Sequence, residues 1–322
     1  MDERATETTP TSRVEPPQPR RAATIGGGLA LGALSALVGI APWLATGARL
    51  PLQNLWRRET LPDAMPVALL PVSQYDSTRI LVLLLVGGVL AGLAARLLRR
   101  RFPTTDWATA VGILAVQGLA TIQAFAVVAD GLGIAAHDAD PRARLYFGGM
   151  LGGTIVSIAL AQALFWLISR RPVAPAALGL ALAGVPVATW LLVTVLFVMG
   201  PAGPPLVVGE LSRWLPAVIV GAALGWCGVV PLRRLGVWAI GLLVLLVTPA
   251  VLTASSYALG MRVLDGDLRE MADAAVRIFP QALVVGVAPT VLALLIAAAV
   301  TAVRWAMARG RTKAPAGGRA EA

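Results

Sequence analysis

Two short acidic segments are the closest approach to a chemical motif in this chain. The letters DADPR begin at Asp138 and the letters DGDLR begin at Asp265, so both segments have the spacing D-x-D-x-R. Two carboxylates two residues apart could bind a divalent cation or a cationic group on a solute, and the two segments together would supply four carboxylates. The candidate external acidic site consists of Asp138, Asp140, Asp265 and Asp267.

Helix capping is the alternative for these residues, and we favour it. Asp140 precedes Pro141, as an N-cap precedes a proline at the first helical position. Asp267 is followed three residues later by Glu270, which is the spacing of a capping box. We therefore expect no catalytic residue, no cofactor and no metal site in this chain.

Neutral residues inside apolar segments form the second set of candidates. These pathway residues are Gln117, Thr121, Gln162, Pro186, Pro249 and Pro289. The polar three fall on two successive apolar segments, and two of them are four residues apart on one helix face. Each proline removes a backbone hydrogen bond near the middle of a segment, which can leave carbonyl groups free to line a solute path. Interhelical hydrogen bonds and simple kinks are the ordinary uses of such residues.

The elements that must position these candidates are membrane-spanning helices. Of the 322 residues, 57% are hydrophobic and only 14% are charged, and the mean hydropathy is +0.76. About 20 apolar residues are needed to cross a hydrocarbon core of ~30 Å, and long runs without alternation are not barrel strands. The sequence predicts an all-α, polytopic transmembrane helix bundle of about eight spans, at 23–47, 80–98, 107–129, 147–168, 173–199, 214–232, 235–259 and 280–303.

The arginines orient this predicted bundle. On one side lie 17 of the 27 Lys and Arg residues but only six of the 17 acidic residues. By the positive-inside rule that side is cytoplasmic, so we expect a cell-membrane protein with both termini in the cytoplasm. The arginines sit at helix ends, so we expect contacts with anionic lipid heads and no nucleic-acid partner. The predicted domains are a disordered tail at 1–22, a transmembrane domain at 23–304 and a disordered tail at 305–322.

Several classes of chemistry are disfavoured by what the spans lack. No ionisable side chain lies near the middle of any predicted span. Such residues cost about 2.5–3.5 kcal/mol each to insert and usually mark proton relays or ion paths. Their lack argues against a proton-driven pump and against an intramembrane hydrolase. The chain also has no Walker motif, so it cannot hydrolyse ATP by itself.

A possible duplication divides the transmembrane domain into halves at 23–171 and 173–304. A shift of 134 positions places Gly87 on Gly221 and aligns the paired arginines that follow each segment. The two D-x-D-x-R segments then occupy equivalent loops. Low-complexity apolar segments also align by chance, which is the competing explanation. Four spans per half would make the repeats parallel, related by an axis along the membrane normal.

Small residues and one loop bear on packing. G-x-x-x-G pairs predict close helix contacts, which oligomer contacts could also use. The pairs are Gly28 and Gly32, Gly88 and Gly92, Gly148 and Gly152, Gly149 and Gly153, and Gly221 and Gly225. The loop at 48–79 contains an apolar portion, residues 61–71, with three prolines. We expect it to lie at the membrane interface or to plug the outer vestibule.

Three classes of function fit these features. The first is a transporter-like permease or flippase for a small neutral or amphipathic solute, with or without a partner ATPase docked on the arginine-rich loops. The second is a non-transporting membrane scaffold or envelope-assembly factor, which could form a homo-oligomer. The least favoured is a membrane transferase that uses a lipid carrier. Convergence of Gln117, Gln162 and Pro249 on one cavity would favour transport, whereas a bundle without such a cavity would favour the scaffold.

Overall fold

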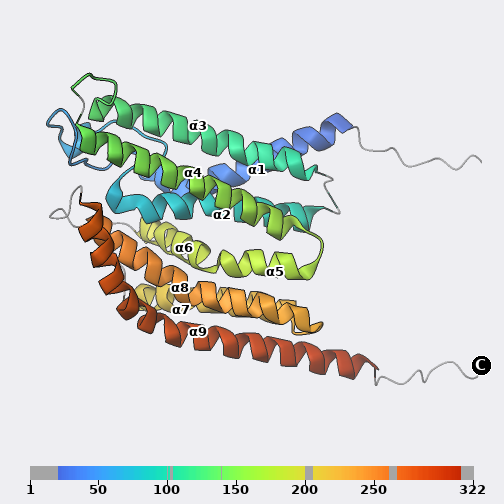
Figure 1. The fold of residues 1–322 in the computed structure, drawn as a ribbon. Helices are drawn as coiled ribbons and strands as arrows, with labels where there is room; N and C mark the ends of the chain where they lie inside the picture. The colour runs from blue at the N-terminus through green and yellow to red at the C-terminus, as the bar shows by residue number, and fades with distance from the viewer. Residues whose placement is uncertain are drawn as a thin grey trace, which may run out of the picture.

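The computed structural model describes residues 21–99, 101, 104–138, 140–199, 206–260 and 267–312. Within these residues the chain forms nine α-helices, joined by loops and short 3-10 turns. Figure 1 shows them packed side by side as one bundle. The helices are α1 (Arg21–Ala45), α2 (Ser77–Leu98), α3 (Asp106–Leu132), α4 (Pro141–Ser169), α5 (Val173–Leu182), α6 (Gly184–Met199), α7 (Leu206–Cys227), α8 (Leu235–Gly260) and α9 (Leu268–Thr312).

The length and hydropathy of these helices establish a multi-pass membrane protein. Six helices, α1 to α4, α8 and α9, are long and apolar enough to cross a bilayer, and α5 with α6 makes a seventh span if the bent pair is counted once. The sequence predicted eight spans, one of them at 214–232. The helix in that region, α7, includes Glu210 and Arg213 and is not among the six. The structure therefore shows an all-α bundle with six to seven candidate spans.

The span predicted at 173–199 is broken into two helices. Helix α5 ends at Leu182, helix α6 begins at Gly184, and their axes differ by 50°. Pro186 explains the position of the break, because it has no N–H to donate to the carbonyl of Leu182, four residues earlier. On either side of this gap the helical bonds continue, from Ala183 N to Gly179 O and from Val187 N to Ala183 O.

The first four helices, called here the first half, pack around one another. Helix α2 packs most extensively on α4, α1 packs on both α3 and α2, and α3 packs on α4. The contact between α2 and α4 is close because it uses glycines. A Cβ atom at Gly88 would lie 2.2 Å from the carbonyl oxygen of Ala161, and one at Gly92 would lie 2.9 Å from the Cβ of Ile168.

The remaining helices, α5 to α9, form the second half and use the same pairs. Helix α7 packs on α9, α5 packs on both α7 and α8, and α8 packs on α9. Glycines again bring the backbones together. A Cβ atom at Gly221 would lie 2.8 Å from the carbonyl oxygen of Ala293, and one at Gly225 would lie 2.5 Å from the Cβ of Val300.

The two halves meet mainly through the broken span. Helix α5 packs on α4, and helix α6 packs on α2 and touches α1. The indole N–H of Trp190 on α6 donates a hydrogen bond of 2.8 Å to the carbonyl of Gly39 on α1. The guanidinium of Arg96 on α2 lies over the ring of Trp226 on α7, 5.0 Å from its centroid. These contacts join the halves near both the middle and one end of the bundle.

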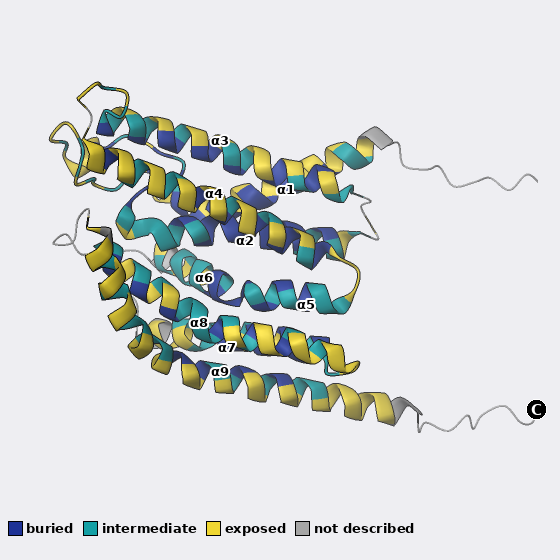
Figure 2. Ribbon diagram, viewed as in Figure 1, coloured by how far each residue is buried: buried dark blue, intermediate teal, exposed yellow. Residues whose placement is uncertain are grey.

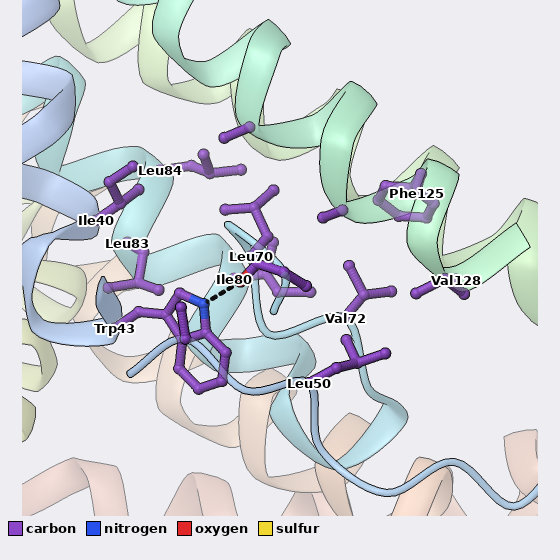
Figure 3. Packing of buried hydrophobic residues seen from close by; sticks show 14 of the residues in the cluster. Ile40, Trp43, Leu50, Leu70, Val72, Ile80, Leu83, Leu84, Phe125 and Val128 are labelled. Atoms are coloured by element: carbon purple, nitrogen blue, oxygen red, sulfur yellow. Dashed lines mark hydrogen bonds between the residues drawn. The ribbon is translucent and has the colours of Figure 1, made fainter. Parts of the chain in front are cut away.

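Residues 48–72 fill one end of the first half. This end of the bundle, where the chain passes from α1 to α2, is called here the loop end, and the opposite end the arginine end. Leu50, Leu70 and Val72 are buried among side chains from α1, α2 and α3 (Figure 3). The indole N–H of Trp43 donates to the carbonyl of Ala68 at 2.8 Å. The structure shows this loop packed into the end of the first half, whereas its position at the membrane interface or in an outer vestibule stays a prediction.

Helix α9 is longer than the predicted eighth span. It runs without interruption from Leu268 to Thr312, through Pro280 and Pro289. Residues 305–312 are therefore helical, although the sequence predicted a disordered tail from 305. The tail residues 1–20 and 313–322 lie outside the described residues. Figure 2 shows that α9 is exposed along much of its length, as a helix at the edge of a bundle is when lipid covers its outer face.

Candidate functional site

A groove of about 430 Å³ lies at the boundary between the halves. Its walls come from α2 and α4 of the first half and from α8 and α9 of the second. Both α4 and α8 contribute lining residues to this groove. A volume of this size falls within the ~300–1,000 Å³ range of small-molecule sites. The groove is therefore the candidate functional site.

The α4 wall is built from small and internally bonded side chains. Gly149 and Gly153 line the groove, and no atom lies within 4 Å of a Cβ placed at either position. The hydroxyl of Thr154 donates to Met150 O at 2.9 Å, and that of Ser157 donates to Gly153 O at 2.8 Å. Because these hydroxyl protons are used within the helix, the wall presents less polarity than its sequence suggests.

The opposite walls are mostly apolar. Ile80 and Leu81 come from α2, while Leu252 and Leu259 come from α8. One polar contact joins the two halves beside them, because the hydroxyls of Thr78 on α2 and Ser256 on α8 are 3.0 Å apart. The exposed atoms of the lining are mainly apolar overall.

The loop end of the groove is its polar end. Arg142, in the first turn of α4, is the one charged residue among those that line the groove. Its guanidinium makes no hydrogen bond or ion pair with the described residues, and the residue is exposed. Tyr146 lies one turn further along α4 and donates from its hydroxyl to Gln53 Oε1 at 2.6 Å. Polar contact with a solute is therefore available at one end only.

The acidic segments stand near this end but do not form a cluster. Asp138 pairs with Arg57 at 2.9 Å. Asp140 accepts a hydrogen bond from the backbone N–H of Arg142 at 2.8 Å, as an N-cap of α4 does. No group of three or more His, Cys, Asp or Glu side chains that could hold a metal occurs among the described residues.

The second acidic segment is described in part. Asp267 accepts hydrogen bonds from the backbone N–H groups of Arg269 and Glu270 at 3.0 and 3.1 Å, which is the geometry of a cap at the start of α9. Asp265 lies outside the described residues. Ligand binding by the four aspartates stays a prediction, and the two that begin helices have capping bonds.

The polar pathway residues make bonds between or within helices. Gln117 on α3 donates to Leu84 O on α2 at 2.8 Å, and Thr121 donates to Gln117 O at 2.7 Å. Gln162 on α4 donates to Ala110 O on α3 at 3.1 Å. The Oε1 atom of Gln117 is buried without a partner among the described residues. None of the three lines the groove.

The three prolines are spread through the second half. Pro186 follows the break between α5 and α6, Pro249 lies inside α8, and Pro289 lies inside α9. None of them lines the groove. The structure thus distributes the six pathway residues over five helices instead of gathering them at this cavity, and their role in a path stays a prediction.

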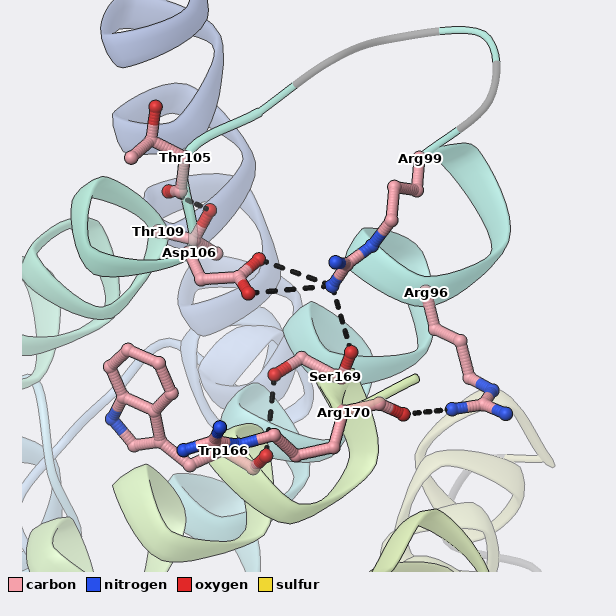
Figure 4. A network of polar contacts seen from close by, with 8 residues as sticks. All are labelled: Arg96, Arg99, Thr105, Asp106, Thr109, Trp166, Ser169 and Arg170. Atoms are coloured by element: carbon pink, nitrogen blue, oxygen red, sulfur yellow. Dashed lines mark hydrogen bonds and ion pairs between the residues drawn. The ribbon is translucent and has the colours of Figure 1, made fainter. Parts of the chain in front are cut away.

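Several arginines bind helix ends, a use that sequence reasoning missed. Arg99 on α2 donates to Ser169 O at the end of α4 at 2.8 Å and pairs with Asp106 at 3.3 Å (Figure 4). Arg96 donates to Arg170 O in the same view. The last carbonyls of a helix have no intrahelical donor, and these guanidinium groups satisfy them.

The second half has matching contacts at the arginine end. Arg304 on α9 donates to Gly225 O at 3.1 Å and also to Trp226 O, near the end of α7. Arg234 donates to Cys227 O at 2.7 Å. These bonds do not exclude lipid contacts, which other exposed arginines at this end, such as Arg170 and Arg171, are free to make.

The groove itself had one signal in the sequence, and it was misinterpreted. The overlapping pairs formed by Gly148 with Gly152 and by Gly149 with Gly153 predicted close helix contacts. No such contact forms within the described chain, because nothing lies within 4 Å of a Cβ at any of the four positions, and their use in oligomer contacts stays a prediction. The other three pairs do make close contacts. Glycines on an open face leave space, and here that space is the groove.

Comparison with protein-family models found no match, and comparison with curated proteins and with solved structures found none either.

Proposed function

We propose that this protein is a carrier, a permease or flippase, for an amphipathic solute that binds in the groove between the two halves. The observation that carries the proposal is a mostly apolar cavity of about 430 Å³ at the boundary of those halves. Carriers place their site between repeats that move against each other. We further propose that the chain itself catalyses no reaction.

In this proposal the carrier is a bundle of eight spans, and two observations support that number of spans. Helix α1 begins and helix α9 ends at the same end of the bundle (Figure 1), which requires an even number of crossings. Helix α7 packs on both α5 and α6, so it covers the length of the broken span and counts as a crossing. With the positive-inside rule, the arginine end is cytoplasmic and the loop end faces outward, in a cell membrane.

The carrier also requires two related halves, and their packing supports a 4+4 parallel repeat. If the broken span counts as one element, the first, second, third and fourth spans of each half form the same pairs. The glycine contacts agree at a shift of 133 positions, one less than the shift that places Gly87 on Gly221. Gly88 and Gly92 approach α4 as Gly221 and Gly225 approach α9. The partner residues also correspond, since Ala161 and Ile168 are spaced as Ala293 and Val300 are.

The broken span gives the halves a place to move. Helices α5 and α6 provide most of the contacts between the halves, and their junction lacks a helical bond at Leu182. A short junction that absorbs dihedral change is what a hinge between rigid bodies needs. Movement there would change the width of the groove.

The second candidate, a scaffold, is favoured by one specific observation. Gln117 and Gln162 both donate to backbone carbonyls of neighbouring helices, and neither lines the groove. A packed first half with its polar groups engaged would suit a protein that only binds partners. A carrier and a scaffold differ in whether the halves must move.

A reversible cross-link tests the carrier. The hydroxyls of Thr78 and Ser256 are 3.0 Å apart across the boundary, so a disulfide between cysteines at these two positions would hold the halves together there. We would prepare the Thr78→Cys/Ser256→Cys variant with Cys227→Ala, and both single-cysteine variants as controls. Each would be placed in proteoliposomes that carry dye-labelled amphiphiles, and transfer between leaflets would be followed by chemical quenching of the outer dye.

The two functions predict different results. For a carrier, the reduced double variant transfers dye faster than empty liposomes, oxidation abolishes the excess rate, and reduction restores it. The single variants respond to neither treatment. A reduced protein that transfers none of the labelled amphiphiles overturns the carrier and leaves the scaffold.

A further inference from the structure

We propose that the groove takes an anionic lipid from the outer leaflet, with its charged head on Arg142 and its hydrocarbon chain along the glycine face of α4. This inference rests on the proposed function for the direction of the loop end, and it names the class of solute. The lipid site and the carrier share two premises, which are the groove and the outward direction of the loop end.

The head group is assigned by charge. Arg142 is the one charged residue that lines the groove, and no acidic residue is among the lining residues. The nearby carboxylates are engaged, because Asp76 pairs with Arg79 at 3.0 Å and Asp140 accepts the N–H of Arg142. A guanidinium offers a fork of donors that matches phosphate or carboxylate oxygens. A head group with one net negative charge therefore complements this end.

The hydrocarbon chain of the lipid is assigned by the length and the apolar character of the groove walls. Lining residues on α4 extend from Arg142 to Ser157, and fifteen residues of helix rise about 22 Å. Beyond the first turns the walls consist of leucines, Met150, glycines and hydroxyls that are bonded within their own helix. Such a surface suits a hydrocarbon chain parallel to the helices and offers little to a wholly polar solute.

The open face of α4 provides the route by which the lipid enters the groove. Gly149 and Gly153 line the groove, whereas Gly148 and Gly152 stand beside it, and all four are exposed. Neighbouring Ile155 and Val156 are exposed as well. Because this apolar face carries no covering element of the described chain, a lipid can enter the groove sideways from the bilayer.

The experiment compares three probes on the full-length protein in an uncharged detergent. Phosphatidylglycerol supplies both parts, phosphatidylcholine with the same chains lacks the net charge, and glycerol phosphate lacks the chains. Binding would be measured by native mass spectrometry and by the shift in thermal unfolding.

Two matched pairs of variants locate the site. Arg142→Gln removes the proposed head contact, while Arg144→Gln removes an exposed arginine that does not line the groove. Gly153→Leu places a side chain in the groove, while Gly152→Leu places one on the same open face outside it. Replacing glycine in a helix favours folding where space allows, so both leucine variants are expected to fold. Both arginines are exposed, so their replacement by glutamine should also leave the fold intact.

We expect phosphatidylglycerol to bind at least about tenfold more tightly than phosphatidylcholine, because only its head group brings a net negative charge to Arg142. The same preference is expected over glycerol phosphate, because only the lipid has hydrocarbon chains to bury in the groove. Arg142→Gln should remove that preference and Gly153→Leu should weaken binding of both lipids about tenfold or more. The control variants should bind as the unaltered protein does.

Three outcomes overturn the inference. They are equal binding of the two lipids, equal binding of glycerol phosphate and phosphatidylglycerol, or Arg142→Gln and Gly153→Leu variants that bind as their controls do. These outcomes are separable from failure of the carrier. Selective binding at Arg142 without dye transfer leaves the lipid site and removes the carrier, whereas dye transfer without charge selection does the reverse.

Discussion

The two halves have the same helix pairs but very different interiors. In the first half, 44% of the apolar window of α3 and 33% of that of α4 are buried, whereas the windows of α8 and α9, which take the same places in the second half, are each 22% buried. Residues 48–72 contribute to this difference, because they add Leu50, Leu70 and Val72 to the interior of the first half. One set of helix contacts can thus support either a filled body or an open one.

Lipid completes the second half. Val284, Val285 and Leu295 on α9 are 72%, 61% and 61% exposed. A soluble protein rarely leaves such contiguous apolar surface uncovered, but a bilayer covers it without cost. The first half is therefore held by its own interior and the second half largely by helix contacts and by the membrane. The following measurements test that contrast.

The largest effect is expected in the buried segment at 48–72. Leu70 is fully buried, so Leu70→Ala should lower the free energy of unfolding by about 2–5 kcal/mol through a cavity in the first half. The matched change in the second half is Leu243→Ala, at a residue that is 59% exposed, where we expect less than about 0.5 kcal/mol. Denaturant unfolding in detergent measures both. Equal losses would remove the contrast between the interiors.

The next effect tests what the halves share. Gly88→Ala and Gly221→Ala each place a Cβ against a carbonyl, at 2.2 and 2.8 Å. We expect both to lower the free energy of unfolding by about 1–3 kcal/mol, with the closer contact of Gly88 losing more. Thermal unfolding would be compared with that of Gly152→Ala, which has open space and should be neutral or stabilising. Loss at one glycine alone would argue against equivalent halves.

A smaller effect is expected at the junction of the halves. Trp190→Phe removes the N–H that donates to Gly39 O at 2.8 Å and should cost about 1 kcal/mol. Because that bond joins the halves, its loss should let the first and second halves unfold at more different temperatures. Calorimetry would show this as a wider separation of their unfolding transitions. Thr194→Val on the same helix removes a bond within α6 to Trp190 O and serves as the control. If both variants leave the transitions together, the broken span is not the main coupling.

The smallest effect is expected at the surface of the first half. Arg57 and Asp138 pair at 2.9 Å, but their side chains are 46% and 75% exposed. Such pairs contribute about 0–1 kcal/mol and are screened by salt. Asp138→Asn should change the midpoint of unfolding little at low salt and not at all at 1 M salt. A large loss that persists at high salt would show that Asp138 does more than pair with Arg57.

The sequence predicted the helices well because the bilayer restricts what can cross it. An apolar run of about 20 residues between polar loops has few structures available to it, so most spans were placed within a few residues. The break before Gly184 was harder to place, since Pro186, Pro249 and Pro289 look alike in sequence. Only the first coincides with a break, while α8 and α9 continue through theirs.

The groove could not be predicted because it depends on which helix faces remain uncovered. Gly88 and Gly149 belong to identical spacing patterns, yet one meets a backbone carbonyl and the other meets open space. The arginine contacts were missed for a similar reason. Arg99 and Arg304 stand in loop-like charge clusters, but the carbonyls they bind belong to helices distant in sequence.

The buried segment at 48–72 has a consequence for biosynthesis. Its apolar residues belong to a buried cluster whose members lie between Ile40 and Ala143, and among the described residues only Trp190 of the second half packs against that cluster. Contacts of such limited sequence separation form early, and chains emerge from the ribosome with their amino-terminal parts first. We expect the first half to acquire its final packing before α7 has been synthesised, so that it serves as the template against which the later helices insert.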